Sequence, residues 1–513
     1  MPLAPQELPS GAVSSRYRFV HAVHRDVLYE RVPAARRVHL HRRAGEALES
    51  LHRGETADIA AELALHFEQG RDWPRAAAAC LQAARNAARR FAHHEAIQLA
   101  TRGLDAVKRL PASEARRQQE LMLLMTLGPA LITAKTFAAP EVQEVYARAR
   151  ALCQQAGETP EIFPVMWGLV RFYLVGSPVT TARALAEEML RLAEGTRDPD
   201  VLIHAHESLG AAATDSGDFG TAREQFDACR RLYDPERHRS HVFYYVQDPG
   251  VACRVREAIA LWCLGYPDQA FELAREGRAL AERIAHPFSE AFALGFSAML
   301  HELARDRDRA RDLADAAVAF STENGFVAFA LLGQLIRAGV HSVEEPAAAA
   351  AMGVREVTTA AREAGILLFH VYGHGLEARA WALAGVPQRG LAALREGLQW
   401  ADRTGERFYE AEMHRLEGDI QLRIGGANAR SRAAACYRRA LAVAARQRAK
   451  SWELRASVSL ASLHRHREDL GPARRIVADA LSWFTEGFDT PDHREARTLL
   501  AEVDRPRVAR ASR

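Results

Sequence analysis

Lysine, asparagine and strand-forming patterns are all scarce in this chain of 513 residues. Lysine occurs only at Lys108, Lys135 and Lys450, and aromatic residues make up 7% of the chain. Alternating runs rich in Val, Ile and Thr, which would predict strands, are nearly absent. Alanine, leucine and arginine dominate instead, and all three are good helix formers. The composition therefore argues against a β-rich fold and predicts an all-helical chain.

A strong net charge is also missing. Lys+Arg and Asp+Glu nearly balance, which leaves a formal net charge of +3. A charge this small gives no long-range field that would draw the chain to nucleic acid or to an anionic membrane. The preference for arginine over lysine is what GC-rich coding produces, so it does not indicate phosphate recognition. We expect neither specific nucleic-acid binding nor membrane binding.

Long apolar runs and paired cysteines are absent as well. The nearest approach to a membrane span, residues 325–340, contains Gln334 and Arg337, and the N-terminus lacks the apolar core of a signal peptide. The cysteines are scattered without a C-x-x-C pair, which favours reduced, packed thiols. We therefore expect a soluble cytoplasmic protein without a zinc site. The six cysteines are Cys80, Cys153, Cys229, Cys253, Cys263 and Cys436.

What the chain does contain is a repeated helical hairpin, clearest in HAHESLGAAATDSGDFGTAREQFDACRRLYDP, residues 204–235. Gly210 on its first helix and Ala222 on its second have almost no side chain, so the two helices can pack closely. Phe226 fills the space toward the next hairpin. Gly217 supplies the left-handed residue that ends the first helix. These positions resemble the tetratricopeptide repeat, a helix-turn-helix unit of about 34 residues.

The same template recurs along the chain, each time as a turn followed by a small residue early in the second helix. Helices joined in this way stack into a solenoid with a concave face, because no single repeat can bury its apolar side alone. Two stretches, 113–140 and 340–354, look like interruptions of the series. The related segments are EQGRDWPRAAAACLQAA, CLGYPDQAFELAREG, ARDRDRARDLADAA, LAGVPQRGLAALREG, SRAAACYRRALAVA and HREDLGPARRIVADA.

The predicted fold is therefore all-α, a tetratricopeptide-like right-handed α-solenoid of stacked antiparallel helix pairs. We expect residues 1–15 to be disordered and residues 16–55 to form a helical junction. The repeat array should then cover 56–500, and a basic tail should occupy 501–513.

The junction carries the most distinctive local pattern, RYRFVHAVHRDVLYERVPAARRVHLHRR, residues 16–43. Apolar residues such as Phe19, Val23 and Val27 fall at helical spacing, and Pro33 opens a second helix with its own apolar stripe. The arginines and most histidines fall on the opposite face. The pattern predicts a helical hairpin with a solvated basic side.

The run from Phe19 through His21, Arg25 and Asp26 to Tyr29 resembles the junction between the winged helix and the repeat array in bacterial STAND-type ATPases. Those proteins are often fused to class III adenylate or guanylate cyclases or to serine/threonine kinases. Further similar segments, such as TGERFYEAEMHRLEGDIQL and KSWELRASVSLASLHRH, extend the resemblance over roughly residues 15–500. The resemblance implies a regulatory repeat module in which His21 would contact the phosphates of bound ADP.

The catalytic parts of that family are missing. No G-x-x-x-x-G-K-[ST] loop occurs anywhere in the sequence, so the phosphate cradle and the magnesium ligand are absent. The nucleotide role of His21 would therefore require a separate ATPase module. We accordingly predict no enzyme activity, no catalytic residues and no cofactor of the chain's own.

Two other groups of residues were weighed as sites. His370, His374 and Glu377 fall at i, i+4 and i+7 and could present metal ligands on one helix face, but such a set lacks a fourth ligand and an orienting shell. Cys253 and Cys263 lie near histidines in sequence, as a nucleophile would. We interpret the first group as a polar helix face and the second as packed thiols, so no metal site is predicted.

Another segment, HVFYYVQDPG (residues 241–250), is the most aromatic run of the chain and leaves the repeat pattern. We expect it to form a packed, extended connection between repeats.

The resulting hypothesis is a noncatalytic interaction and sensor module that binds a protein partner or a small effector on its concave face. By the resemblance, it would relay that binding to an ATPase, cyclase or kinase module, and the arginine face of residues 16–43 would dock on that module. Two alternatives remain open: the effector-sensing part of a transcription regulator, and a stand-alone assembly scaffold.

Overall fold

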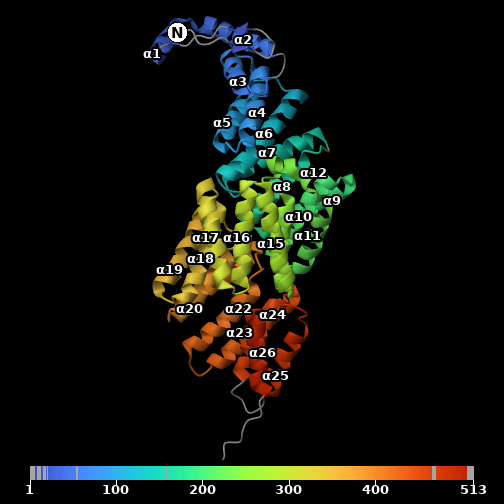
Figure 1. The fold of residues 1–513 in the computed structure, drawn as a ribbon, viewed down its shortest axis with the longest axis vertical. Coiled ribbons are helices and arrows are strands. Elements are labelled where there is room, and N and C mark those ends of the chain that lie inside the picture. The colour runs from blue at the N-terminus through green and yellow to red at the C-terminus, as the bar shows by residue number, and fades with distance from the viewer. Residues whose placement is uncertain are drawn as a thin grey trace, which may run out of the picture. The chain divides into compact units, whose positions relative to one another are not determined.

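The computed structural model describes residues 6–7, 13–14, 19, 21–52, 56–157, 159–176, 178–464 and 470–504 (Figure 1). These ranges are helical, apart from a two-residue antiparallel ladder between Gln6–Glu7 (β1) and Val13–Ser14 (β2). The predicted all-α fold is confirmed, with this ladder as its one departure in the described ranges. The other residues of the 1–15 segment, and residues 505–513 of the expected tail, lie outside the described residues.

The chain divides into two compact units. The first comprises Met1–Ala134 and Glu144–Val165, and the second comprises Lys135–Gln143 and Met166–Arg513. No helix in the described ranges is long and apolar enough to cross a membrane. The helices from the N-terminus to the unit boundary are α1 (Ala22–Arg31), α2 (Ala34–Leu51), α3 (Ala60–Gln69), α4 (Trp73–Arg89), α5 (His93–Val107), α6 (Glu114–Ala134), α7 (Pro140–Ala156) and α8 (Ile162–Gly176).

The second unit is a series of antiparallel helix pairs, in which each helix packs on its chain neighbour and on the next pair. Its helices are α9 (Val179–Thr196), α10 (Pro199–Asp215), α11 (Phe219–Leu232), α12 (Pro235–His238), η1 (Arg239–His241), α13 (Val242–Tyr245), α14 (Pro249–Leu264), α15 (Pro267–Ile284), α16 (Pro287–Leu303), α17 (Arg307–Asn324), α18 (Val327–Glu344), α19 (Ala348–Glu363), α20 (His370–Leu383), α21 (Pro387–Thr404), α22 (Glu410–Ile424), α23 (Ala429–Gln447), α24 (Lys450–His464), α25 (Gly471–Ser482) and α26 (Pro491–Asp504).

The α10–α11 hairpin shows why the repeat pattern folds as it does. A Cβ added to Gly210 would lie 2.8 Å from Cε1 of Phe226, so the ring occupies the place where a side chain would be. Gly217 adopts φ 77°, the left-handed conformation that ends α10. Asp218 then caps α11 by accepting a hydrogen bond from the backbone N–H of Thr221 at 3.3 Å. The predicted turn and the close approach of the two helices at Gly210 are confirmed, but the ring of Phe226, expected to fill the space toward the next hairpin, lies against Gly210 of its own hairpin.

The same construction is present at the six related segments. A turn precedes α4, α15, α17, α21 and α23, and a small residue near the start of each of these helices and of α25 is buried. Small side chains at this position let the second helix approach the first, as in the α10–α11 hairpin. These small residues are Ala76, Ala270, Ala310, Gly390, Ala433 and Ala473.

The stretches expected to interrupt the repeat series had different outcomes. Residues 113–140 hold the 21-residue helix α6, which continues through Pro129, and the boundary between the two units, after Ala134, falls within this stretch. Residues 340–354 contain only a short turn between α18 and α19, and α19 begins at Ala348, so the interruption expected there is wrong. The expectation of an extended connection at 241–250 is also wrong, because this aromatic run forms the helical turns η1 and α13 followed by the start of α14.

Candidate functional site

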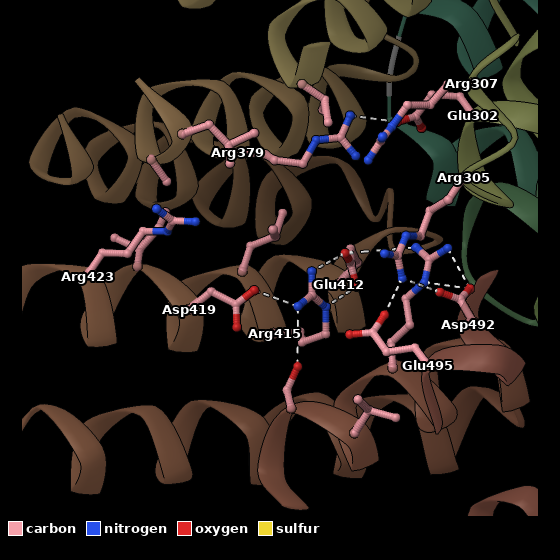
Figure 2. Close-up of a pocket in the computed structure, with 18 of the residues that line it drawn as sticks. Glu302, Arg305, Arg307, Arg379, Glu412, Arg415, Asp419, Arg423, Asp492 and Glu495 are labelled. Atoms are coloured by element: carbon pink, nitrogen blue, oxygen red, sulfur yellow. Dashed lines mark hydrogen bonds and ion pairs between the residues drawn. The ribbon is translucent and has the colours of Figure 1, made fainter. Parts of the chain in front are cut away.

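A pocket of about 320 Å³ lies in the second unit on the side formed by the first helices of successive hairpins (Figure 2). Its lining comes from α16, α18, α20, α22, α24 and α26, together with the turn that leads into α17. The repeat places these first helices side by side, so side chains at the same face of each one converge. Charged residues dominate the lining: six arginines, Arg305, Arg307, Arg379, Arg415, Arg423 and Arg455, and five carboxylates, Glu302, Glu412, Asp419, Asp492 and Glu495.

Glu302 joins α16 to α20. Its carboxylate accepts hydrogen bonds from the hydroxyl of Tyr372 at 2.7 Å and from Nη2 of Arg379 at 2.6 Å. Glu302 is 5% exposed, so its charge depends on these two partners rather than on water. Burial, together with the nearby Glu302 charge, raises the pKa of Tyr372, which therefore stays a neutral donor. The three side chains fix the relative positions of two hairpins.

Arg415 lies at the centre of the pocket, between Glu412 and Asp419 (Figure 2). Its Nε and Nη2 donate to the two carboxylate oxygens of Glu412, each at 2.7 Å, in a bidentate arrangement. Its Nη1 donates to Asp419 at 2.6 Å, and the other oxygen of Asp419 accepts from the Tyr437 hydroxyl at 2.6 Å. The guanidinium is therefore held by two carboxylates of its own helix, and the carboxylates are in turn held in place.

Asp492 links the last helix of the unit to two earlier hairpins. It accepts from Nη1 of Arg305 at 2.9 Å and from Nε of Arg455 at 2.8 Å, while Arg305 also donates to Glu495 at 2.6 Å. Arg455 additionally donates to the backbone carbonyl of Leu303. Burial alone would raise the pKa of Asp492, but the attraction of Arg455 and Arg305 outweighs burial and lowers it. Asp492 is therefore ionised at neutral pH.

Arg307 and Arg423 differ from the other four arginines of the pocket. Neither has a hydrogen bond or ion pair with a residue that the structure describes. Figure 2 shows them on opposite sides of the paired charges. Apolar side chains, including Val340, Leu416 and Ile420, complete the lining. The pocket thus offers two cationic groups free to bind an anionic ligand, separated by a network whose carboxylates are already neutralised.

This charge arrangement suits recognition rather than catalysis. The carboxylates at its centre are hydrogen-bonded to arginine side chains, so they serve as ion-pair partners rather than as free acid or base groups. Guanidinium groups without partners bind carboxylates strongly because the fork of N–H donors matches two oxygens. The pocket can therefore bind an extended chain that carries acidic groups, with apolar contacts between them.

His21, the residue assigned a nucleotide role, lies at the N-terminal end of α1 in the first unit. It is exposed, and its ring packs edge-on against His24 with centroids 5.6 Å apart. The apolar side of the same helix is exposed too: Val23 is 67% exposed, Val27 43% and Leu28 52%. Among the described residues, α1 therefore exposes its apolar side as well as the basic side that the sequence predicted to be solvated.

The other residues considered as metal or nucleophile sites are buried or in contact with neighbouring side chains. Glu377 is buried and accepts from the indole N–H of Trp381 at 3.1 Å, and His370 is buried with its ring 5.0 Å from that of Trp400. No group of ligating side chains suitable for a metal occurs among the described residues. All six cysteines are buried and free. Burial raises the pKa of the Cys263 thiol, which disfavours the thiolate that a nucleophile needs.

None of the pocket residues was identified from the sequence. Their partners are distant along the chain; Arg305 and Asp492, for example, are 187 positions apart. The available signal was a charged residue placed inside an otherwise apolar first helix, as with Glu302 in FALGFSAMLHEL and Arg455 in WELRASVSLASL. Such a charge is buried only if the fold supplies a partner.

Comparison with known proteins supports the fold and leaves the family open. No family model matches the chain. An uncharacterized protein of Rhizobium meliloti (strain 1021) is 23% identical over 451 residues, which cover 87% of this chain and 43% of that protein. The chain therefore spans less than half the length of this relative.

Among solved structures, a Rap protein complexed with competence and sporulation factor matches with a TM-score of 0.53 at 13% identity, covering 72% of this chain and 99% of that one. The Rap conjugation gene regulator of plasmid pLS20 in complex with the Phr* peptide matches with a TM-score of 0.43 at 10% identity, over 74% and 96%. The first of these similarities places the chain among tetratricopeptide-type helical solenoids.

Proposed function

We propose that this chain is a noncatalytic sensor and interaction module, and that the pocket of α16–α26 binds an acidic peptide segment of a protein partner. The observation that carries the proposal is the pair of unpartnered arginines, Arg307 and Arg423, on either side of the paired charges. A peptide would place one carboxylate at each arginine and its apolar side chains against Val340, Leu416 and Ile420.

The fold supports this use. Stacked helical hairpins present an extended face of side chains from successive repeats, which is the surface that such proteins use for binding. The Rap protein of similar fold was crystallised with competence and sporulation factor. In this chain the ion-pair network around Arg415 and Asp492 would form a rigid wall of the binding site, because each of its charges already has a partner.

The proposal is tested by selecting peptides from a random library displayed on phage and measuring the affinity of the enriched sequences by fluorescence anisotropy. We expect the selected peptides to carry two acidic groups. The variant Arg307→Gln/Arg423→Gln should weaken their binding at least ~10-fold, because each charge-assisted hydrogen bond contributes about 1.5–3 kcal/mol. The affinity of the unchanged protein should also fall as salt is raised, because exposed charges are screened.

A matched control is available on the second helices of the same unit. Arg395 on α21 and Arg438 on α23 are exposed and do not line the pocket. The variant Arg395→Gln/Arg438→Gln removes the same total charge and should bind the peptides as the unchanged protein does. Equal losses in the two double variants would mean that only net charge matters, and selected peptides without acidic residues would contradict the proposed chemistry.

We further propose that the module regulates a STAND-type ATPase, or a cyclase or kinase linked to one. This part rests on the motif around His21 and on the greater length of the Rhizobium relative. Partner binding would then act by population shift: it favours the state of the module that binds the partner more tightly, and only a difference in affinity between two states can drive the change. The exposed apolar residues of α1 would contact the regulated module.

A further inference from the structure

A second cavity, of about 70 Å³, lies in the second unit and shares no lining residue with the charged pocket. Most of its lining is apolar and comes from the C-terminal part of α8, from α16, α18 and α19, and from the segment that precedes α20. Aromatic rings form much of its wall: Phe292 and Phe296 lie 4.4 Å apart between centroids, and Phe369 lies 5.7 Å from Phe296.

Three polar residues also line this cavity, and all are deeply buried. Arg171 is 4% exposed, Arg256 3% and Gln247 2%. Arg171 forms an ion pair with Glu207, and Arg256 donates through Nη2 to both oxygens of Asp215 at 2.9 and 2.8 Å. Each arginine charge is therefore already balanced by a buried carboxylate.

Each of the three polar residues nevertheless keeps one buried atom without a hydrogen-bond partner among the described residues. These atoms are Nε of Arg171, Nε of Arg256 and Oε1 of Gln247. Two are donors and one is an acceptor. Buried polar atoms almost always have partners, and these three belong to residues that line one cavity, so a group bound in it would complete them.

The nature of the missing group follows from this set. Two arginine N–H donors require an acceptor oxygen, and Gln247 Oε1 requires an N–H or O–H donor. An anion would bring an unbalanced charge into an apolar cavity, because both guanidinium charges are already neutralised. A neutral amide has the required carbonyl oxygen and N–H in a single group. Water fits the polar end, but the apolar wall gives a second water too few partners.

We propose that this cavity binds a small neutral amide. Its carbonyl oxygen accepts from the arginine Nε–H groups, its N–H donates to Gln247 Oε1, and its methyl group lies against the phenylalanine and leucine side chains. The cavity has about half of the roughly 150 Å³ that accommodates a benzene ring, so it takes an amide no larger than acetamide.

The test uses the full chain and two probes of equal shape, acetamide and acetate, titrated in saturation-transfer NMR. We expect saturable millimolar binding of acetamide and at least tenfold weaker binding of acetate. Equal or tighter binding of acetate would overturn the neutral-ligand assignment. Absence of saturable acetamide binding would overturn the site itself.

Two cavity-filling variants show where the probe binds. Ala328→Leu places extra carbons in the cavity and should abolish the acetamide signal, whereas Ala392→Leu, on an exposed position of α21, should leave it unchanged. Ala361→Leu fills the cavity from α19 and serves if the first variant does not fold, as judged by circular dichroism. Acetamide binding that survives in a folded cavity-filling variant would show that the probe binds elsewhere and would overturn the proposal.

Discussion

At the scale of single residues, glycine sets how closely the helices of a hairpin approach. Replacing Gly210 with leucine forces a side chain into the space held by the buried ring of Phe226, 2.8 Å from the new Cβ. We expect Gly210→Leu to reduce the free energy of unfolding by about 1–3 kcal/mol, because overpacking displaces well-packed neighbours. Thermal unfolding followed by circular dichroism measures the effect.

Gly353, in the middle of α19, provides the control for that substitution. A Cβ at this position would meet nothing within 4 Å. Gly353→Leu should therefore leave stability unchanged or raise it slightly, since leucine has the better helix propensity. Similar losses in the two variants would show that glycine at 210 is not there for close packing.

Residue-scale predictions from sequence succeeded where the contact is local. Gly210 and Gly217 belong to one hairpin, so the close approach of its helices and its turn are set by local spacing and could be predicted. The partners of Glu302 could not: Arg379 is 77 positions away and reaches it only through the stacking of separate hairpins. One sequence alone does not indicate which distant charges meet.

At the scale of elements, the second helices were predicted well and the connections poorly. The turn before a second helix has a local signal, a glycine, proline or aspartate followed by a small residue, and the structure confirms it before α4, α11, α15, α17, α21 and α23. Within residues 113–140, where an interruption was expected, α6 runs through Pro129, because a helix that is packed along much of its length can tolerate a proline. Tertiary packing overrode local propensity there.

One element-scale prediction concerns histidines that join α10 to η1 and α13. His204 is buried, stacks on Tyr245 with centroids 3.3 Å apart, and shares a 2.8 Å hydrogen bond between its Nε2 and Nδ1 of His241. Burial and the neighbouring histidine charges lower the pKa of His204 well below its usual range, and burial lowers the pKa of His241 to about 4. The charged groups that act on the pair are Arg171, Asp198, Asp200, Arg237 and His238.

The sign of the pH effect follows from these directions. The unfolded chain protonates both histidines near pH 6.5, whereas the folded chain keeps them neutral, so the free energy of unfolding falls as pH drops from about 6.5 toward 4. Each group contributes at most about 1.4 kcal/mol per pH unit, and less for the partly exposed His241. His204→Gln/His241→Gln should therefore lose less thermal stability between pH 7 and 5 than the unchanged protein.

The control replaces two exposed histidines, His94 and His341, with glutamine. This variant should keep the pH dependence of the unchanged protein, measured as thermal midpoints at half-unit steps of pH. Parallel curves for all three proteins would show that the His204–His241 contact is not the source of acid sensitivity.

At the scale of the whole molecule, the property that matters most is whether further protein covers the exposed apolar residues of α1. The Rhizobium relative is more than twice as long as its matching segment, and α1 exposes Val23, Val27 and Leu28 where a globular protein would cover them. The regulated module of the proposed function, placed next to α1, would account for both observations. The motif at His21 suggested such a module from the sequence. The residues that would contact it could not be predicted, because a contact surface is defined only by a complex of the two parts.

We therefore predict that the native gene product in its host is larger than the 56.7 kDa of this chain. An immunoblot with an antibody raised against residues 209–235 should show a band well above that mass, because the regulated ATPase would be part of the same polypeptide. Val23→Glu/Leu28→Glu in the longer protein should then alter its ATPase regulation, since charges would replace apolar contacts at α1. A single band at 56.7 kDa would contradict the fused arrangement and leave a separate adaptor, whose partners must be sought by their binding to the charged pocket.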